Sequence, residues 1–183
     1  MTVRRALIAA GIVAACLGAS APAAIAAPCA NVDVQPAVGN GPLIRRATIC
    51  LLNRQRTKHH LGKLHANTPL RGVAQTYARL MVVLHFFDHV APSGSTFVER
   101  IKQSTYLHGF SGWALGENLA WGTANESTPR QIVRAWMHSP GHRANILNGT
   151  YRDIGVGVAT GVPVLGIGGT GATYVNEFGQ RTR

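Results

Sequence analysis

The hydrophobic pattern changes its period along the chain, and this change restricts the fold more than any other feature of the sequence. From about Leu43 to Met137, apolar residues recur every three or four positions, which indicates amphipathic helices. Between Ile154 and Phe178 they alternate at a period of two, which indicates strands. Helices first and strands last, within 183 residues, predict one α+β domain with helices packed on a small antiparallel sheet.

Four helices are expected. The clearest has Thr68 as its N-cap and Pro69 in its first turn, and its apolar stripe continues to residue 84. A helix from about residue 43 precedes it, and a short helix capped by Ser95 or Thr96 follows. The fourth begins at Pro129, before a further short helix at Pro140.

Three strands are expected, over residues 117–122, 154–158 and 172–178. The glycine-rich stretch 161–171 lies between the last two and is typical of a hairpin connection. These strands would form the small sheet on which the helices pack.

The first 27 residues have the pattern of a secretory signal peptide. Arg4 and Arg5 precede an apolar stretch, and Ala24-Ile25-Ala26 offers a cleavage site. We therefore expect a secreted protein, with an N-terminal arm over residues 28–42 and a domain over residues 43–183. A lipid anchor at Cys16 is a less favoured alternative, because Leu17 is not the usual residue after a lipidated cysteine. No later segment reaches the roughly 18 apolar residues of a membrane span.

Two cysteines remain once this segment is removed. Cys29 and Cys50 can pair in only one way, and exported chains favour disulfides. We predict a bridge that ties the arm to the first helix.

The chain is strongly basic. It has 18 Lys and Arg against 7 Asp and Glu, a net charge of +11, which would suit an anionic cell-wall polymer or lipid as partner. A solvated basic surface is the favoured interpretation of this charge. The basic residues are spread along the chain with no run that interleaves aromatic residues, and this argues against nucleic acid. We expect a monomer.

Polar residues gather in three stretches. In His85-Phe-Phe-Asp-His89, at the end of the second helix, the two histidines are four apart and could share a helix face, but a metalloprotease helix needs Glu where Phe86 stands. Glu117 precedes an apolar strand, so its carboxylate must meet solvent, a cation, a hydrogen-bond donor or a metal.

The third stretch runs from Trp136 to Leu147. Pro140 suits the first turn of a new helix with Ser139 as N-cap, so the helix ending at His138 stops there and His138 lies at the surface. His142 then stands near a helix N-terminus, where the helix dipole favours the neutral imidazole of a metal ligand or general base. A nucleophilic Ser139 is disfavoured, because capping would engage its oxygen and no G-x-S-x-G elbow is present.

Five motifs in this order resemble a known family: Phe87-Asp88-His89, Gly116-Glu117-Asn118-Leu119-Ala120, the stretch from Trp136 to Leu147, Ile154-Gly155-Val156-Gly157-Val158, and Tyr174-Val175-Asn176-Glu177-Phe178-Gly179. They resemble the bacterial branch of the CAP superfamily, which includes cysteine-rich secretory, antigen 5 and pathogenesis-related proteins and whose domain is also called the SCP domain. The resemblance covers about residues 45–179. It implies an α-β-α sandwich with a central antiparallel sheet.

The resemblance also implies a cleft lined by two histidines and one or two glutamates, which match His89, Glu117 and His142. Animal and plant members of the family have a cluster of two histidines and two glutamates. Two departures in this sequence argue against a full copy of that cluster. Ser139 stands at the position of their W-x-x-E glutamate, and Tyr174-Val175-Asn176 stands where they have their second histidine.

The main functional prediction is therefore an extracellular binding or effector module whose ligand is unknown. One alternative is a metal-dependent hydrolase in which His89, Glu117 and His142 are catalytic and hold a divalent metal such as Zn²⁺ with an open position. Another is a lipid or sterol carrier.

Overall fold

The computed structural model describes residues 28–167 and 170–183. The predicted signal peptide and Cys16 lie outside the described residues.

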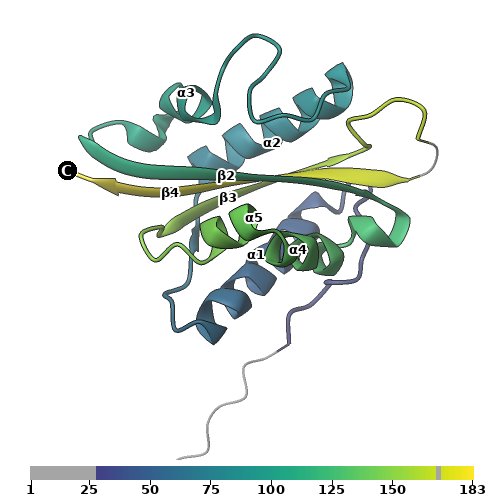
Figure 1. Ribbon diagram of the computed structural model, residues 1–183, viewed down its shortest axis with the longest axis horizontal. Coiled ribbons are helices and arrows are strands. Elements are labelled where there is room, and N and C mark those ends of the chain that lie inside the picture. Colours follow the sequence, from purple (N-terminus) through teal and green to yellow (C-terminus); the bar gives the residue numbers. More distant parts are fainter. Residues whose placement is uncertain (1–27, 168–169) are drawn as a thin grey trace, which may run out of the picture.

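The domain has three layers, with the sheet in the middle (Figure 1). One face carries α2 (Thr68–Leu84) and α3 (Phe97–Lys102). The other carries α1 (Gly41–Lys58), α4 (Pro129–His138) and α5 (Pro140–Ile146). This confirms the predicted α-β-α sandwich. Two short 3₁₀ turns, Thr105–Leu107 and Ala124–Ser127, flank β2.

The sheet has the strand order β1-β3-β4-β2. Its three long strands, β2 (Gly112–Thr123), β3 (Asp153–Thr160) and β4 (Gly171–Thr182), pair antiparallel, as predicted. The two-residue strand β1 (His65–Ala66) was not expected, and it pairs parallel with the start of β3. The order leaves β2 at one edge of the sheet and most of β3 at the other.

Two glycines let α2 lie directly on β3. A Cβ on Gly155 would stand 2.1 Å from the carbonyl carbon of Leu70, and a Cβ on Gly157 would stand 2.2 Å from that of Ala74. Both atoms belong to the backbone of α2, so they cannot move aside as a side chain would. The alternation of glycine and valine in β3 thus reflects helix packing on one face and an apolar core on the other.

Each face of the sheet has its own core. Trp136, Tyr174 and Phe178 lie in the larger cluster, which the sheet forms with α1, α4 and α5. Tyr77 and Met81 of α2 pack on the other face in a smaller cluster with Leu119 and Val175. Four polar residues of β2 and β4 are buried with these clusters, namely Glu117, Asn118, Asn176 and Glu177.

The N-caps of α2, α5 and α3 were each predicted from the sequence. The N-cap of α2 is Asn67, whose side chain accepts from the Leu70 N–H, and Thr68 is the first helical residue. Ser139 is the N-cap residue of α5, but its side chain makes no capping hydrogen bond, so capping does not argue against a nucleophile there. Thr96 caps α3 in a full capping box, as one of the two predicted options.

The stretch His85 to His89 is not helical. The helix α2 ends at Leu84, and His85 adopts a left-handed conformation with φ 52°. The two histidines therefore do not share a helix face, as their spacing would have allowed, because the helix ends before His85 and His89 lies in the following loop.

The predicted disulfide between Cys29 and Cys50 is present. It joins the arm to α1, beside Val32 and Ala47. In the described part of the chain, no helix combines the length and the apolar character needed to cross a bilayer.

Candidate functional site

Glu117 forms the centre of the candidate site. Its side chain is fully buried on β2, and each of its carboxylate oxygens has a cationic partner. Oε1 lies 2.7 Å from Nδ1 of His89, and Oε2 lies 2.7 Å from Nη2 of Arg100. Burial of this carboxylate is thus offset by charge-assisted hydrogen bonds.

Arg100 is held rigidly on α3. Its Nη1 donates to the carbonyls of Ser95, at 2.8 Å, and His89, at 3.2 Å. Its guanidinium carbon stands 3.3 Å from the centroid of the Tyr77 ring, so α2 supports it through a cation–π contact. One arginine therefore joins α3, the His89 loop and β2 at Glu117.

A second buried carboxylate stands beside the first. Glu177 on β4 is the register partner of Glu117, and it is fully buried. Among the described residues, neither of its oxygens has a hydrogen-bond partner when both are treated as acceptors. Burial, followed by the charge of Glu117, raises the pKa of Glu177 well above its usual range. We infer a protonated Glu177 that can donate to the ionised Glu117.

His142 is tied to the same strand from the other side. The Asn118 side chain donates to the His142 carbonyl at 3.0 Å. Asn145, one turn later on α5, donates to the Glu117 carbonyl and to Oδ1 of Asn118. Asn118 alternates with Glu117 along β2, so its side chain faces α5 while that of Glu117 faces α2 and α3.

The two histidines have opposite pKa shifts. The hydrogen bond to Glu117 raises the pKa of His89 above its usual value. Burial, followed by the charge of His89, lowers the pKa of His142. Near neutral pH the centre therefore combines an imidazole biased toward its charged form with one biased toward its neutral form.

The structure joins His89 directly to Glu117 and places His142 near enough for His89 to affect its titration. Sequence reasoning missed Arg100 and Glu177. For Glu177 a signal existed, because a carboxylate on the alternate face of a strand with apolar neighbours needs a partner. No local signal indicated Arg100, which reaches Glu117 from a separate helix.

These residues do not fit a metal ion. Each oxygen of Glu117 is paired with a side-chain nitrogen, of Arg100 or of His89, and both groups would compete with a metal ion for this carboxylate. Within residues 28–167 and 170–183, no three His, Cys, Asp or Glu side chains are gathered in a metal-binding arrangement. The buried charge is neutralised by Arg100 and His89.

A cavity of about 360 Å³ lies beside this centre, between α2 and α3. Arg100, Tyr77 and Ser95 are among its lining residues. It gives a small molecule a route to the α3 side of Arg100.

Known proteins share this architecture. The family model described as the cysteine-rich secretory protein family (CAP) matches residues 50–163. Protein YkwD of Bacillus subtilis (strain 168) is 36% identical over 107 residues, 58% of this chain and 39% of that protein. Membrane protein YlbC of the same strain is 32% identical over 108 residues, 59% of this chain and 29% of that protein. This chain thus matches well under half the length of either relative.

Solved structures agree with the fold. An extracellular protein containing a SCP domain from Bacillus anthracis has a TM-score of 0.57 at 26% identity, over 76% of this chain and 40% of that one. An outer surface protein from Borrelia burgdorferi has a TM-score of 0.62 at 24% identity, over 75% of this chain and 92% of that one. The three-layer fold thus defines a SCP-type domain. The chain belongs to the CAP, or cysteine-rich secretory protein, family.

Proposed function

We propose that the chain is an exported monomer that acts outside the cell as a ligand-binding module. Residues 1–27 are its signal peptide, residues 28–42 its arm, and residues 43–183 its binding domain. The disulfide between Cys29 and Cys50 supports an oxidising compartment, where such bonds persist.

The observation that carries this proposal is the double engagement of Glu117. A carboxylate held by Arg100 and His89 sets the charge and orientation of its partners and is not available to react. Because His89 uses Nδ1 for Glu117, its Nε2 is left for a ligand, and 52% of its side chain is exposed. His89 is thus an oriented contact group.

The pKa shifts indicate which ligands suit the centre. A His89 biased toward the charged form favours a carboxylate or another anion, and a neutral His142 can donate to or accept from a hydroxyl or amide. Soluble peptidoglycan fragments carry all these groups. Without Arg4 and Arg5 of the signal peptide, the exported form has a net charge of +9, which favours the same class of anionic partner.

The two alternatives have less support. In a hydrolase built on a metal, the ion would have to compete with Arg100 and His89 for Glu117, because each oxygen of that carboxylate is already paired with one of them. A lipid carrier would need an apolar surface at this centre, where the contact groups are charged or polar.

Calorimetric titration with soluble muropeptides tests the proposal. We expect binding that weakens about tenfold in His89→Ala and in His142→Ala, since each removes one hydrogen bond, at least one of them charged. His138→Ala is the matched control, because His138 is exposed at the end of α4 and should leave affinity unchanged. An affinity for muropeptides that is unchanged in both His89→Ala and His142→Ala would contradict the proposal. Zn²⁺ binding by metal-stripped protein that is lost in the two site variants would favour the hydrolase instead.

A further inference from the structure

A second candidate site lies at the opposite edge of the sheet from Glu117. Beyond Ile154, the strand β1 no longer covers β3, and α1 and α2 flank the open edge. Two cavities of about 380 and 190 Å³ follow this edge, and both are lined by Pro42 and Arg45. We call these two cavities together the β3-edge groove.

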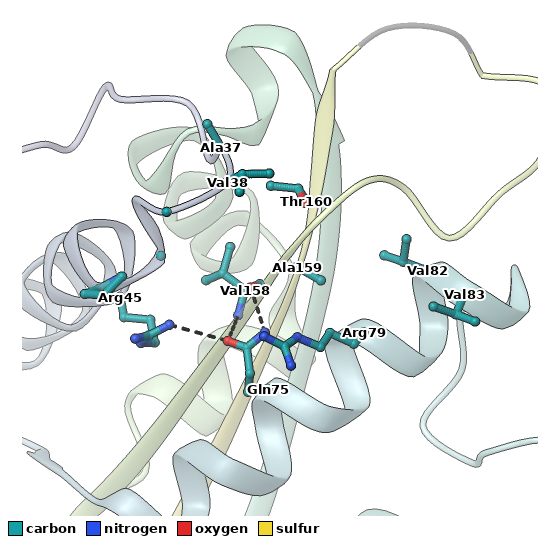
Figure 2. Close-up of a pocket in the computed structure, with 13 residues that line it drawn as sticks. Ala37, Val38, Arg45, Gln75, Arg79, Val82, Val83, Val158, Ala159 and Thr160 are labelled. Atoms are coloured by element: carbon teal, nitrogen blue, oxygen red, sulfur yellow. Dashed lines mark hydrogen bonds between the residues drawn. The ribbon is translucent and has the colours of Figure 1, made fainter.

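Gln75 takes the place of a neighbouring strand at the middle of this edge. Its side-chain amide donates to the Val158 carbonyl at 2.9 Å and accepts from the Val158 N–H at 3.2 Å. Nη1 of Arg45 donates to the same Gln75 oxygen at 3.4 Å (Figure 2). Gln75 therefore closes part of the edge and holds Arg45 over the groove.

Four arginines line the groove without any acidic partner. They are Arg45 and Arg46 of α1 and Arg71 and Arg79 of α2. All seven Asp and Glu residues lie in the described part of the chain, yet none lines either cavity and none forms an ion pair with these arginines.

This arrangement of charge is unfavourable without a ligand. Burial and the charges of the other three arginines lower the pKa of Arg45. Like charges gathered without counterions oppose folding, and an anion bound among them would remove that repulsion.

The arginines form a row along the groove. Arg71 and Arg79 are eight residues apart on α2, so their backbones are separated by about 12 Å along the helix. Arg71 lines one cavity, Arg79 lines the other, and Arg45 lines both. A single anion could reach only part of this row, whereas an extended chain of anions could contact all of it.

The residues that line the groove also restrict which kind of polyanion can bind there. They include small and aliphatic residues but no Phe, Tyr or Trp, so nucleic-acid bases would find no surface for stacking. We propose that the β3-edge groove binds a linear phosphate polymer without bases, with successive phosphates on Arg71, Arg45 and Arg79. The site is independent of the His89 centre, which lies at the other edge of the sheet.

Binding of short-chain inorganic polyphosphate to the full exported chain, followed by fluorescence anisotropy at several salt concentrations, tests this site. Arg71→Ala/Arg79→Ala should weaken binding about tenfold and make the salt dependence shallower by about 1 to 2 in log–log slope, because two phosphate contacts are lost. Arg54→Ala/Arg143→Ala is the matched control, since it removes the same charge from exposed positions outside the groove. The control should retain the affinity of the unmodified chain.

Several results would overturn the proposal. Equal losses in the two double variants would show that only general surface charge is involved, and no binding of polyphosphate would remove the site. Inorganic monophosphate that binds as tightly as the polymer would indicate a single-anion site. Tighter binding of single-stranded DNA, or groove-dependent binding of phosphatidylglycerol vesicles without polyphosphate binding, would assign the groove to those ligands instead.

Discussion

Glu117 and Glu177 stand directly opposite each other on β2 and β4, yet among the described residues Glu117 alone of the two is paired with basic side chains. Glu117 is held by His89 and Arg100, whereas Glu177 is buried and no described side chain forms a hydrogen bond with it as an acceptor. Two buried carboxylates this close are not both ionised at moderate pH, so the glutamates on the two neighbouring strands have different protonation states. One carries the charge and the other keeps a proton.

This division predicts a specific dependence of stability on pH. Below the usual value of 4.5, Glu177 is protonated in both the folded and the unfolded chain. As pH rises, the unfolded chain releases this proton while the folded chain retains it, because the folded pKa is raised. The free energy of unfolding therefore falls with rising pH, by up to about 1.4 kcal/mol per unit from this group.

Glu177→Gln should remove that loss, because Gln matches the neutral acid in shape. Urea unfolding from pH 4 to pH 8 should show the variant close to the unmodified chain at the acid end and increasingly more stable than it toward neutral pH. A constant difference at every pH would mean that Glu177 titrates normally in the folded protein.

Arg100→Met should destabilise the domain by about 3 kcal/mol, because it leaves a fully buried carboxylate with His89 alone. Arg54→Met is the control, since Arg54 is exposed on α1. Adding Glu117→Gln to Arg100→Met should recover part of the loss, because the buried charge is then absent. If Arg100→Met costs no more than the control, the Arg100–Glu117 pair contributes nothing to stability.

Gly157→Ala should cost about 1 to 3 kcal/mol, because the new Cβ meets the backbone of α2 at Ala74. Gly72→Ala is the matched substitution on α2 itself, where a Cβ would meet no atom within 4 Å. It should stabilise the helix by about 0.5 to 1 kcal/mol. Thermal unfolding of both variants gives the comparison, and equal melting temperatures would refute close packing of α2 on β3.

Reduction of the Cys29–Cys50 bridge should lower the free energy of unfolding by about 3 kcal/mol, since the two cysteines are 21 residues apart. The double variant Cys29→Ser/Cys50→Ser should show the same loss without reductant, and reductant should then have no further effect. Stability that does not change on reduction would mean that the bridge does not constrain the arm.

The apolar pattern was sufficient to predict most of the elements, whereas the three layers were implied by the family resemblance. Apolar periodicity is a local property, so α2, α4 and the strands β3 and β4 could be found from it. The two-residue strand β1 could not, because it exists only through its pairing with β3. His85 likewise shows that a spacing of four does not establish a shared helix face when the helix has already ended.

The candidate site was only partly predictable, for a related reason. His89, Glu117 and His142 stand in recognisable motifs, but their chemistry depends on residues that reach them through tertiary structure. Arg100 contacts Glu117 from α3, and the pairing of β2 with β4 places Glu177 beside it. The motifs alone, without Arg100 and Glu177, left Glu117 as a possible metal ligand. With them, the carboxylate is already engaged.

The most direct test of this account is an NMR titration of the imidazoles of His89 and His142, in the unmodified chain and in Glu117→Gln. We expect the pKa of His89 above 6.5 and that of His142 below it. In Glu117→Gln the pKa of His89 should fall, because its charged hydrogen-bond partner is gone. A His89 pKa at or below 6.5, or one that Glu117→Gln leaves unchanged, would contradict the claim that Glu117 controls the charge of the ligand-binding centre.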